Sequence, residues 1–168
     1  MSNRIHIIAT GGTIDSEYFP PRETSVPSKE SIIAPYITGK IKPYGNITFE
    51  TLFMLDSGDI TDTHRAQIAE CVRRTDASRV IICHGTNTMT ATTAYLESAL
   101  APHRKTIILT GSMIPLKEFA QSDAGFNLGF AMAESLHLNA GIYICMNARV
   151  FPAGTVRKNF DEGRFEPV

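Results

Sequence analysis

The stretch RIHIIATGGTID, residues 4–15, joins a strand to a turn of small polar residues. Its first part, Arg4–Ala9, is rich in isoleucine, which is typical of a strand covered on both faces of a parallel sheet. Thr10, two glycines and Thr13 follow directly. Because ligands of open α/β sheets bind beyond the carboxyl ends of the strands, this stretch predicts both an α/β fold and a site at the strand end.

The same pattern recurs along the chain. Further strands are predicted at Ile47–Leu55, Arg79–Cys83, Thr106–Thr110 and Gly141–Cys145, and helices at Ser28–Ile37, Thr61–Thr75, Thr88–Leu100 and Ala124–His137. Strands that alternate with helices favour parallel pairing through right-handed crossovers. We therefore predict an α/β fold with a single open, doubly wound, mostly parallel sheet flanked by helices, of flavodoxin-like type. The whole chain, residues 1–168, is interpreted as one domain.

The composition argues against several classes of protein. A net charge of -1 in 168 residues gives no basis for binding nucleic acid or an acidic membrane. The apolar runs are too short to cross a membrane, and the N-terminus lacks the pattern of a secretory leader. Cys71, Cys83 and Cys145 lack the spacing of a metal site. We therefore expect a cytoplasmic protein with no metal, and a small molecule as its ligand.

Four clusters of small polar residues fall where predicted strands end. They are Thr10–Thr13, Asp56–Asp59, His84–Thr88 and Thr110–Met113. Such residues let backbone N–H groups approach a ligand, and their hydroxyls act as nucleophiles or donors, although the same residues also form turns and helix caps. The first turn lacks the G-x-G-x-x-G spacing and the lysine of a phosphate loop, so a nucleotide site is the least favoured interpretation.

The order of these motifs resembles that of the bacterial-type L-asparaginase family. The segments IIATGGTID, LDSGDIT, IICHGTNTM, ILTGSMIPL, SDAGFNL and MNARVFPAGTVRKN are similar to its N-terminal domain along nearly the whole chain. The resemblance implies hydrolysis of L-asparagine to L-aspartate and ammonia through a threonine nucleophile and an acyl-enzyme. It also implies that neither a metal nor an organic cofactor takes part.

The resemblance assigns the roles of individual residues. Thr13 corresponds to the nucleophile, Thr86 to a second catalytic threonine and Lys158 to the active-site lysine, which suits a hydroxyl that needs a base within reach. Tyr18, in the predicted long loop Asp15–Lys29, is the nearest match to the family's loop tyrosine. Substrate binding is implied for Gly12, Asp56, Ser57, Gly85, Asn87 and Ser112.

Two further interpretations concern the surroundings of these residues. His84 is interpreted as a strand-end residue that packs beside the site, and the backbone N–H groups after His84 or Thr110 are expected to stabilise an oxyanion. The family's smaller C-terminal domain has no counterpart in the 168 residues. We therefore expect a homodimer or a larger homo-oligomer to complete the site.

Asn87 is the main departure from the family, which has an aspartate at this position of the HGT motif. A neutral amide cannot balance a lysine or the α-ammonium group of asparagine. One possibility is that Asp15, Asp56 or Asp59 binds the ammonium group instead.

Asn87 also keeps two other interpretations open. One is hydrolysis of a different small amide, such as glutamine or an amide without an α-amino group. The other is a non-catalytic module that binds a small amino acid, against which the presence of Thr13, Thr86 and Lys158 argues.

Overall fold

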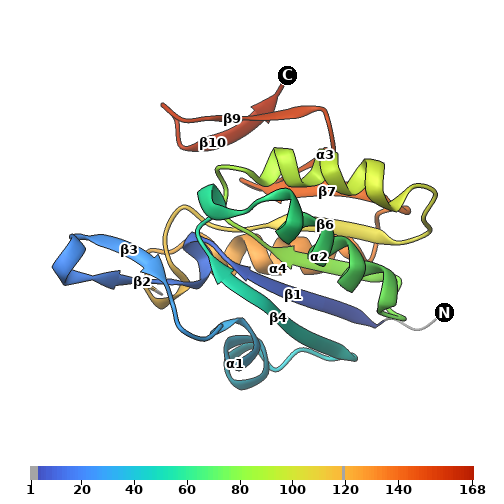
Figure 1. Cartoon of the computed structure of the whole chain (residues 1–168). Coiled ribbons are helices and arrows are strands. Elements are labelled where there is room, and N and C mark those ends of the chain that lie inside the picture. Colours follow the sequence, from blue (N-terminus) through green and yellow to red (C-terminus); the bar gives the residue numbers. More distant parts are fainter. Residues whose placement is uncertain (1–3, 119) are drawn as a thin grey trace.

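A six-stranded sheet lies at the centre of the molecule (Figure 1) in the computed structural model, which describes residues 4–118 and 120–168. The order is β4-β1-β5-β6-β7-β8. The five parallel strands are β1 (Ile5–Gly11), β4 (Ile47–Leu55), β5 (Arg79–Cys83), β6 (Thr106–Thr110) and β7 (Gly141–Met146). An antiparallel strand, β8 (Arg149–Pro152), pairs with β7 at one edge. Since the second parallel strand lies outside the first, this is the flavodoxin-like order, and the predicted fold class is confirmed.

Helices cover both faces of the sheet. They are α1 (Ile33–Tyr36), α2 (Asp62–Arg74), α3 (Met89–Leu100) and α4 (Ala124–Ser135). Successive residues of β1 point to opposite faces, so Ile8 packs with residues of α2 and α3, whereas Ile7 packs with residues of α1 and α4. The predicted α2, α3 and α4 are confirmed, and Thr61 forms a capping box with His64 at the start of α2. No helix within the described residues is long and apolar enough to span a bilayer.

The helix predicted at Ser28–Ile37 begins later than expected. Helical geometry starts at Ile33 and continues as a π-helical segment, Ile37–Ile41. The residues before it are engaged elsewhere, because Ser28 donates its N–H to the carbonyl of Asp15 and Ile32 donates its N–H to the Asp15 carboxylate at 2.8 Å. These bonds prevent the first turn of the predicted helix from forming.

The predicted loop Asp15–Lys29 is largely a β-hairpin, so that prediction is wrong. The antiparallel strands β2 (Ser16–Phe19) and β3 (Thr24–Pro27) are joined by a short 3-10 turn, and the hairpin extends away from the sheet (Figure 1). An ion pair between Glu17 and Lys117 connects the hairpin to the segment after β6. Proline lacks the N–H that a strand donates to its neighbour, but Pro27 lies at the end of β3, where this loss does not prevent the two strands from pairing.

A second hairpin, absent from the predicted elements, follows β8. It consists of β9 (Val156–Asn159) and β10 (Arg164–Pro167) and lies beside α3 (Figure 1). Val156 and Phe165 are buried in the same core cluster as residues of α2 and α3. This packing fixes the position of β9, which carries Lys158.

Candidate active site

Close backbone packing brings three of the strand-end clusters together. A Cβ atom added to Gly12 would lie 2.4 Å from the Cα of Gly85, and one added to Gly85 would lie 2.6 Å from the Cβ of Ser57. Gly12 also adopts a φ of 75°, which disfavours any side chain. Glycine at both positions therefore lets the ends of β1, β4 and β5 meet, as the sequence predicted.

Thr13 lies immediately beyond the contact between Gly12 and Gly85. It begins a 3-10 turn, Thr13–Asp15, and its side chain is partly exposed. Its hydroxyl takes part in none of the hydrogen bonds found among residues 4–118 and 120–168. The Thr13 hydroxyl is therefore open to a ligand at the edge of the sheet where the other clusters meet.

Thr86, Asn87 and Lys158 form a hydrogen-bonded group. The Nζ atom of Lys158 lies 2.7 Å from Oγ1 of Thr86 and 2.6 Å from Oδ1 of Asn87. Thr86 is 5% exposed, whereas Asn87 is exposed. Burial lowers the pKa of Lys158, and the carboxylate of Asp56 acts in the opposite direction. A lysine with a lowered pKa is more readily neutral than an ordinary lysine, and the neutral form is the one that accepts a proton.

The three aspartates considered as substitutes for the missing family carboxylate differ in position. Asp56 is exposed, and its charge acts on Lys158. Asp15 is fully buried with its carboxylate bonded to the Ile32 N–H, so it is closed to a ligand in this structure. Asp59 is exposed at the end of the 3-10 turn after β4. The structure therefore favours Asp56 as the nearby negative charge.

His84 is a buried, neutral residue beside the site, as predicted. Its Nδ1 donates to the carbonyl of Gly85 at 2.7 Å, and its Nε2 accepts from the hydroxyl of Thr92 at 3.0 Å. Arg65 in turn donates to that hydroxyl at 3.2 Å. Burial lowers the pKa of His84 to about 4. A neutral imidazole with both nitrogens engaged holds the backbone around Gly85 in position and is not available as a base.

Ser112, for which the resemblance implies substrate binding, lies with the loop after β6 in a network of hydrogen bonds within the protein. Ser112 is fully buried and donates to the carbonyl of Ile114 at 2.6 Å. The carboxylate of Asp123 accepts the N–H groups of Met113 and Ile114 at 3.0 Å and the side-chain amide of Asn127 at 2.9 Å. Two of the amides near the predicted oxyanion site are therefore engaged within the protein.

Asp123 is a positioning residue that the sequence interpretation missed. It stands immediately before α4, where an aspartate is usually read as an ordinary helix cap. Its place in the SDAGFNL segment is the signal that could have drawn attention to it.

Tyr18 lies on β2 opposite Ser25 and is 55% exposed. Among the described residues, no hydrogen bond joins its hydroxyl to Thr13, Thr86 or Lys158. The role that the resemblance implies for Tyr18 is therefore not accompanied by a hydrogen bond to these three residues in this structure.

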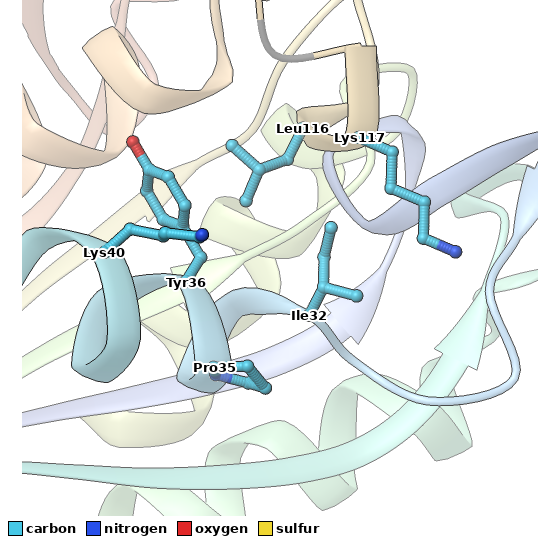
Figure 2. Close-up of a pocket in the computed structure, with 6 residues that line it drawn as sticks. All are labelled: Ile32, Pro35, Tyr36, Lys40, Leu116 and Lys117. Atoms are coloured by element: carbon cyan, nitrogen blue, oxygen red, sulfur yellow. The ribbon is translucent and has the colours of Figure 1, made fainter.

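A surface cavity of about 530 Å³ lies elsewhere, between α1 and the 3-10 turn Leu116–Glu118 (Figure 2). Its lining is mainly apolar, with lysine side chains from both sides, and comprises Ile32, Pro35, Tyr36, Lys40, Leu116 and Lys117. None of these six is a predicted site residue. The candidate active site is therefore identified by the hydroxyl and ammonium groups at the strand ends, and this cavity is not part of it.

Residues 4–164 match the family model "Asparaginase, N-terminal". The chain belongs to the asparaginase family. It is 29% identical over 170 residues to a glutaminase-asparaginase from Acinetobacter glutaminasificans, a match that covers 95% of this chain and 50% of that protein. It is 29% identical over 163 residues to a probable periplasmic L-asparaginase from Haemophilus influenzae, covering 92% and 46% respectively.

The fold is shared with solved asparaginases. The thermostable L-asparaginase from Thermococcus kodakarensis superposes with a TM-score of 0.81 at 24% identity, over 98% of this chain and 51% of that one. This asparaginase-family chain thus spans about half the length of the solved neighbour and of the two curated relatives. The resemblance seen in the sequence motifs is confirmed at the level of family and fold.

Proposed function

We propose that the chain hydrolyses L-asparagine to L-aspartate and ammonia, with Thr13 as nucleophile. The observation that carries this proposal is the contact of 2.7 Å between the Lys158 Nζ and the Thr86 Oγ1. It joins a hydroxyl of the β5 loop to an amine from a hairpin 72 residues away, and burial lowers the pKa of that amine. Such a pair supplies the proton transfer that threonine chemistry requires.

In the proposed first step, the Thr13 oxygen attacks the carboxamide carbon and the C–N bond breaks. The hydroxyl proton passes to the leaving nitrogen through the Thr86–Lys158 pair, so that ammonia leaves and an ester of Thr13 remains. In the second step, a water gives a proton to the same pair and attacks the ester. This step releases the carboxylic acid and restores the Thr13 hydroxyl, so the two steps together consume one amide and one water.

A second candidate substrate is an amide that lacks the α-ammonium group. Asn87 Oδ1 accepts from Lys158, so besides a second lone pair on that oxygen the uncharged side chain offers a ligand the two hydrogens of its amide nitrogen. These hydrogens suit an acceptor on the substrate and not a cation. Asp56 favours asparagine itself, because it supplies a negative charge near Lys158.

The proposal is tested by ammonia release from L-asparagine, L-glutamine and the deaminated analogue of asparagine. Wild type is compared with Thr86→Val, which keeps the shape of the side chain and removes the hydroxyl, and with Thr155→Val, a matched change on an exposed threonine. We expect asparagine turnover in wild type and Thr155→Val, and a large loss in Thr86→Val. Turnover of the analogue alone would favour the second substrate, and silence of all three proteins would contradict the hydrolase proposal.

We further propose that the protein is cytoplasmic and that a second copy completes the site. All three cysteines are free and buried, which suits a reducing compartment.

The proposed assembly is supported by exposed apolar side chains on α4. Phe126 lies on the outer side of this helix, is 58% exposed and stacks on Phe130. Leu136 lies at the end of the helix and is 44% exposed. Light scattering of wild type and Phe126→Lys tests the assembly, since a dimer formed through α4 should dissociate in the variant.

A further inference from the structure

A group of three potential metal ligands lies at the other end of the sheet from the catalytic threonines. His6 is near the start of β1, Glu50 is in the middle of β4, and Cys71 is on the inner side of α2. His6 and Cys71 are 7% and 1% exposed, and Glu50 is partly exposed. The proposed hydrolysis makes no use of these residues, which are far apart in the sequence.

The separations of the donor atoms suit a small tetrahedral cation. The Cys71 Sγ lies 3.3 Å from the Glu50 Oε2 and 3.8 Å from the His6 Nε2, and that nitrogen lies 3.8 Å from the same carboxylate oxygen. Zinc bonds of about 2.0–2.3 Å at tetrahedral angles place neighbouring donors about 3.4–3.6 Å apart. Small side-chain adjustments are therefore enough to bring all three atoms onto one ion.

Neighbouring side chains orient two of the three ligands. His6 Nδ1 lies 2.8 Å from the Thr48 hydroxyl, so a proton on Nδ1 donates to Thr48 and leaves the lone pair of Nε2 directed at the group. The other oxygen of Glu50, Oε1, accepts from Arg74, which leaves Oε2 facing Cys71. Hydrogen bonds from neighbouring side chains that orient the ligands in this way are typical of metal sites.

The group is also open to solvent on one side. Glu50 and Cys71 line a surface cavity of about 330 Å³ together with Leu52, Gln67, Glu70 and Arg74. A water molecule from this cavity would complete the coordination. From this geometry we infer that His6, Glu50 and Cys71 form a binding site for one divalent transition-metal ion of the zinc type.

Binding exchanges a proton for the metal. Burial raises the pKa of the Cys71 thiol to about 11, so at neutral pH the S–H bond breaks as the S–metal bond forms, and the proton leaves to solvent. His6 binds through its neutral lone pair and releases no proton. The charged groups that act on His6 and Cys71 are the negatively charged Glu50 and Asp76 and the positively charged Arg74 and Lys105.

The inference is tested by titrating the chelator-treated 168-residue chain with Zn²⁺ against a chromophoric chelator, and with Co²⁺ while recording near-ultraviolet absorption. We expect about one Zn²⁺ per chain, about one proton released, and a thiolate-to-cobalt band. Cys71→Ala and His6→Gln should each weaken binding by more than the ~10–100-fold typical of outer partners, and Thr48→Val by about that amount.

The matched controls are Cys145→Ala, a buried cysteine outside the group, and His137→Asn, an exposed histidine. Both should bind Zn²⁺ like wild type. If the two core variants fail to fold, Glu50→Gln provides the test, since this side chain is partly exposed and the change keeps its shape. Absence of Zn²⁺ binding by wild type, or equal binding by wild type and Cys71→Ala, would overturn the inference.

Discussion

The two ends of strand β1 lie beside two different groups of polar side chains. Beyond its carboxyl end, Gly12 and Gly85 bring backbones into contact so that Thr13 and Thr86 lie on neighbouring loops. Near its amino end, His6 meets Glu50 and Cys71 through side chains of two strands and a helix. The first group depends on loops that need glycine, and the second on the faces of regular elements. A motif is therefore visible in the sequence for the first group and not for the second.

The largest effect is expected from Thr13→Ala. Removing a covalent nucleophile should lower the rate of ammonia release by about 10³-fold or more. Glu50→Gln should leave the rate close to that of wild type, because Glu50 is partly exposed and belongs to the group at the opposite end of the sheet. Rates of ammonia release measured side by side for the two variants show whether the group near the amino end of β1 contributes to hydrolysis. A comparable loss of rate in both variants would mean that the two groups are not independent.

Lys158→Met should produce the next largest effect. Methionine keeps much of the length of the side chain but cannot accept a proton, so kcat should fall by about 10²–10⁴-fold, the usual contribution of a positioned acid or base. Exogenous primary amines should restore part of the rate. Arg157→Met, on the same strand but exposed, is the control. Full activity of Lys158→Met would remove the lysine from the mechanism.

Gly12→Ala tests the backbone contact on which the carboxyl end depends. Gly12 and Gly154 share a φ of 75°, but a Cβ on Gly154 would meet nothing within 4 Å, whereas one on Gly12 would lie 2.4 Å from Gly85. Gly154→Ala should lower the free energy of unfolding by about 1–2 kcal/mol through backbone strain. Gly12→Ala should lose a further 1–3 kcal/mol or so through overpacking. Denaturant unfolding measures both, and equal losses would mean that the contact relaxes easily.

Asn87→Asp should have the smallest effect, a shift in pH dependence. If Lys158 acts while neutral, kcat/KM rises with pH through the pKa of Lys158. A carboxylate at 2.6 Å in place of the amide oxygen stabilises the charged lysine, so the acid limb should move to higher pH, by about 1–3 units. Asp56→Asn removes a charge that raises this pKa and should move the limb to lower pH. Measuring kcat/KM against pH for both variants distinguishes the two directions. A shift of the acid limb in the same direction in both variants would exclude Lys158 as the titrating group.

Much of the fold was predictable because each parallel strand and its following helix carry their own local signals. β4, β5 and β6 have the predicted bounds, and the capping box at Thr61 marks the start of α2. The hairpins were missed for a physical reason. Strands of four residues such as β2 and β9 contain too few alternations to define a period of two, and cross-strand pairing decides their geometry.

The sequence alone determined the strand-end clusters, because glycine and hydroxyl residues follow apolar strands in a fixed order, and the motifs in that order carried the resemblance to the asparaginase family. The expected roles of Thr13, Thr86 and Lys158 came from that resemblance. Only the tertiary structure decided that Lys158 contacts Thr86, that Ser112 and Asp15 face inward, and that His6, Glu50 and Cys71 meet. A one-dimensional pattern records what each residue can do beside its chain neighbours. Contacts between residues dozens of positions apart depend on how the sheet twists and how each helix packs on it.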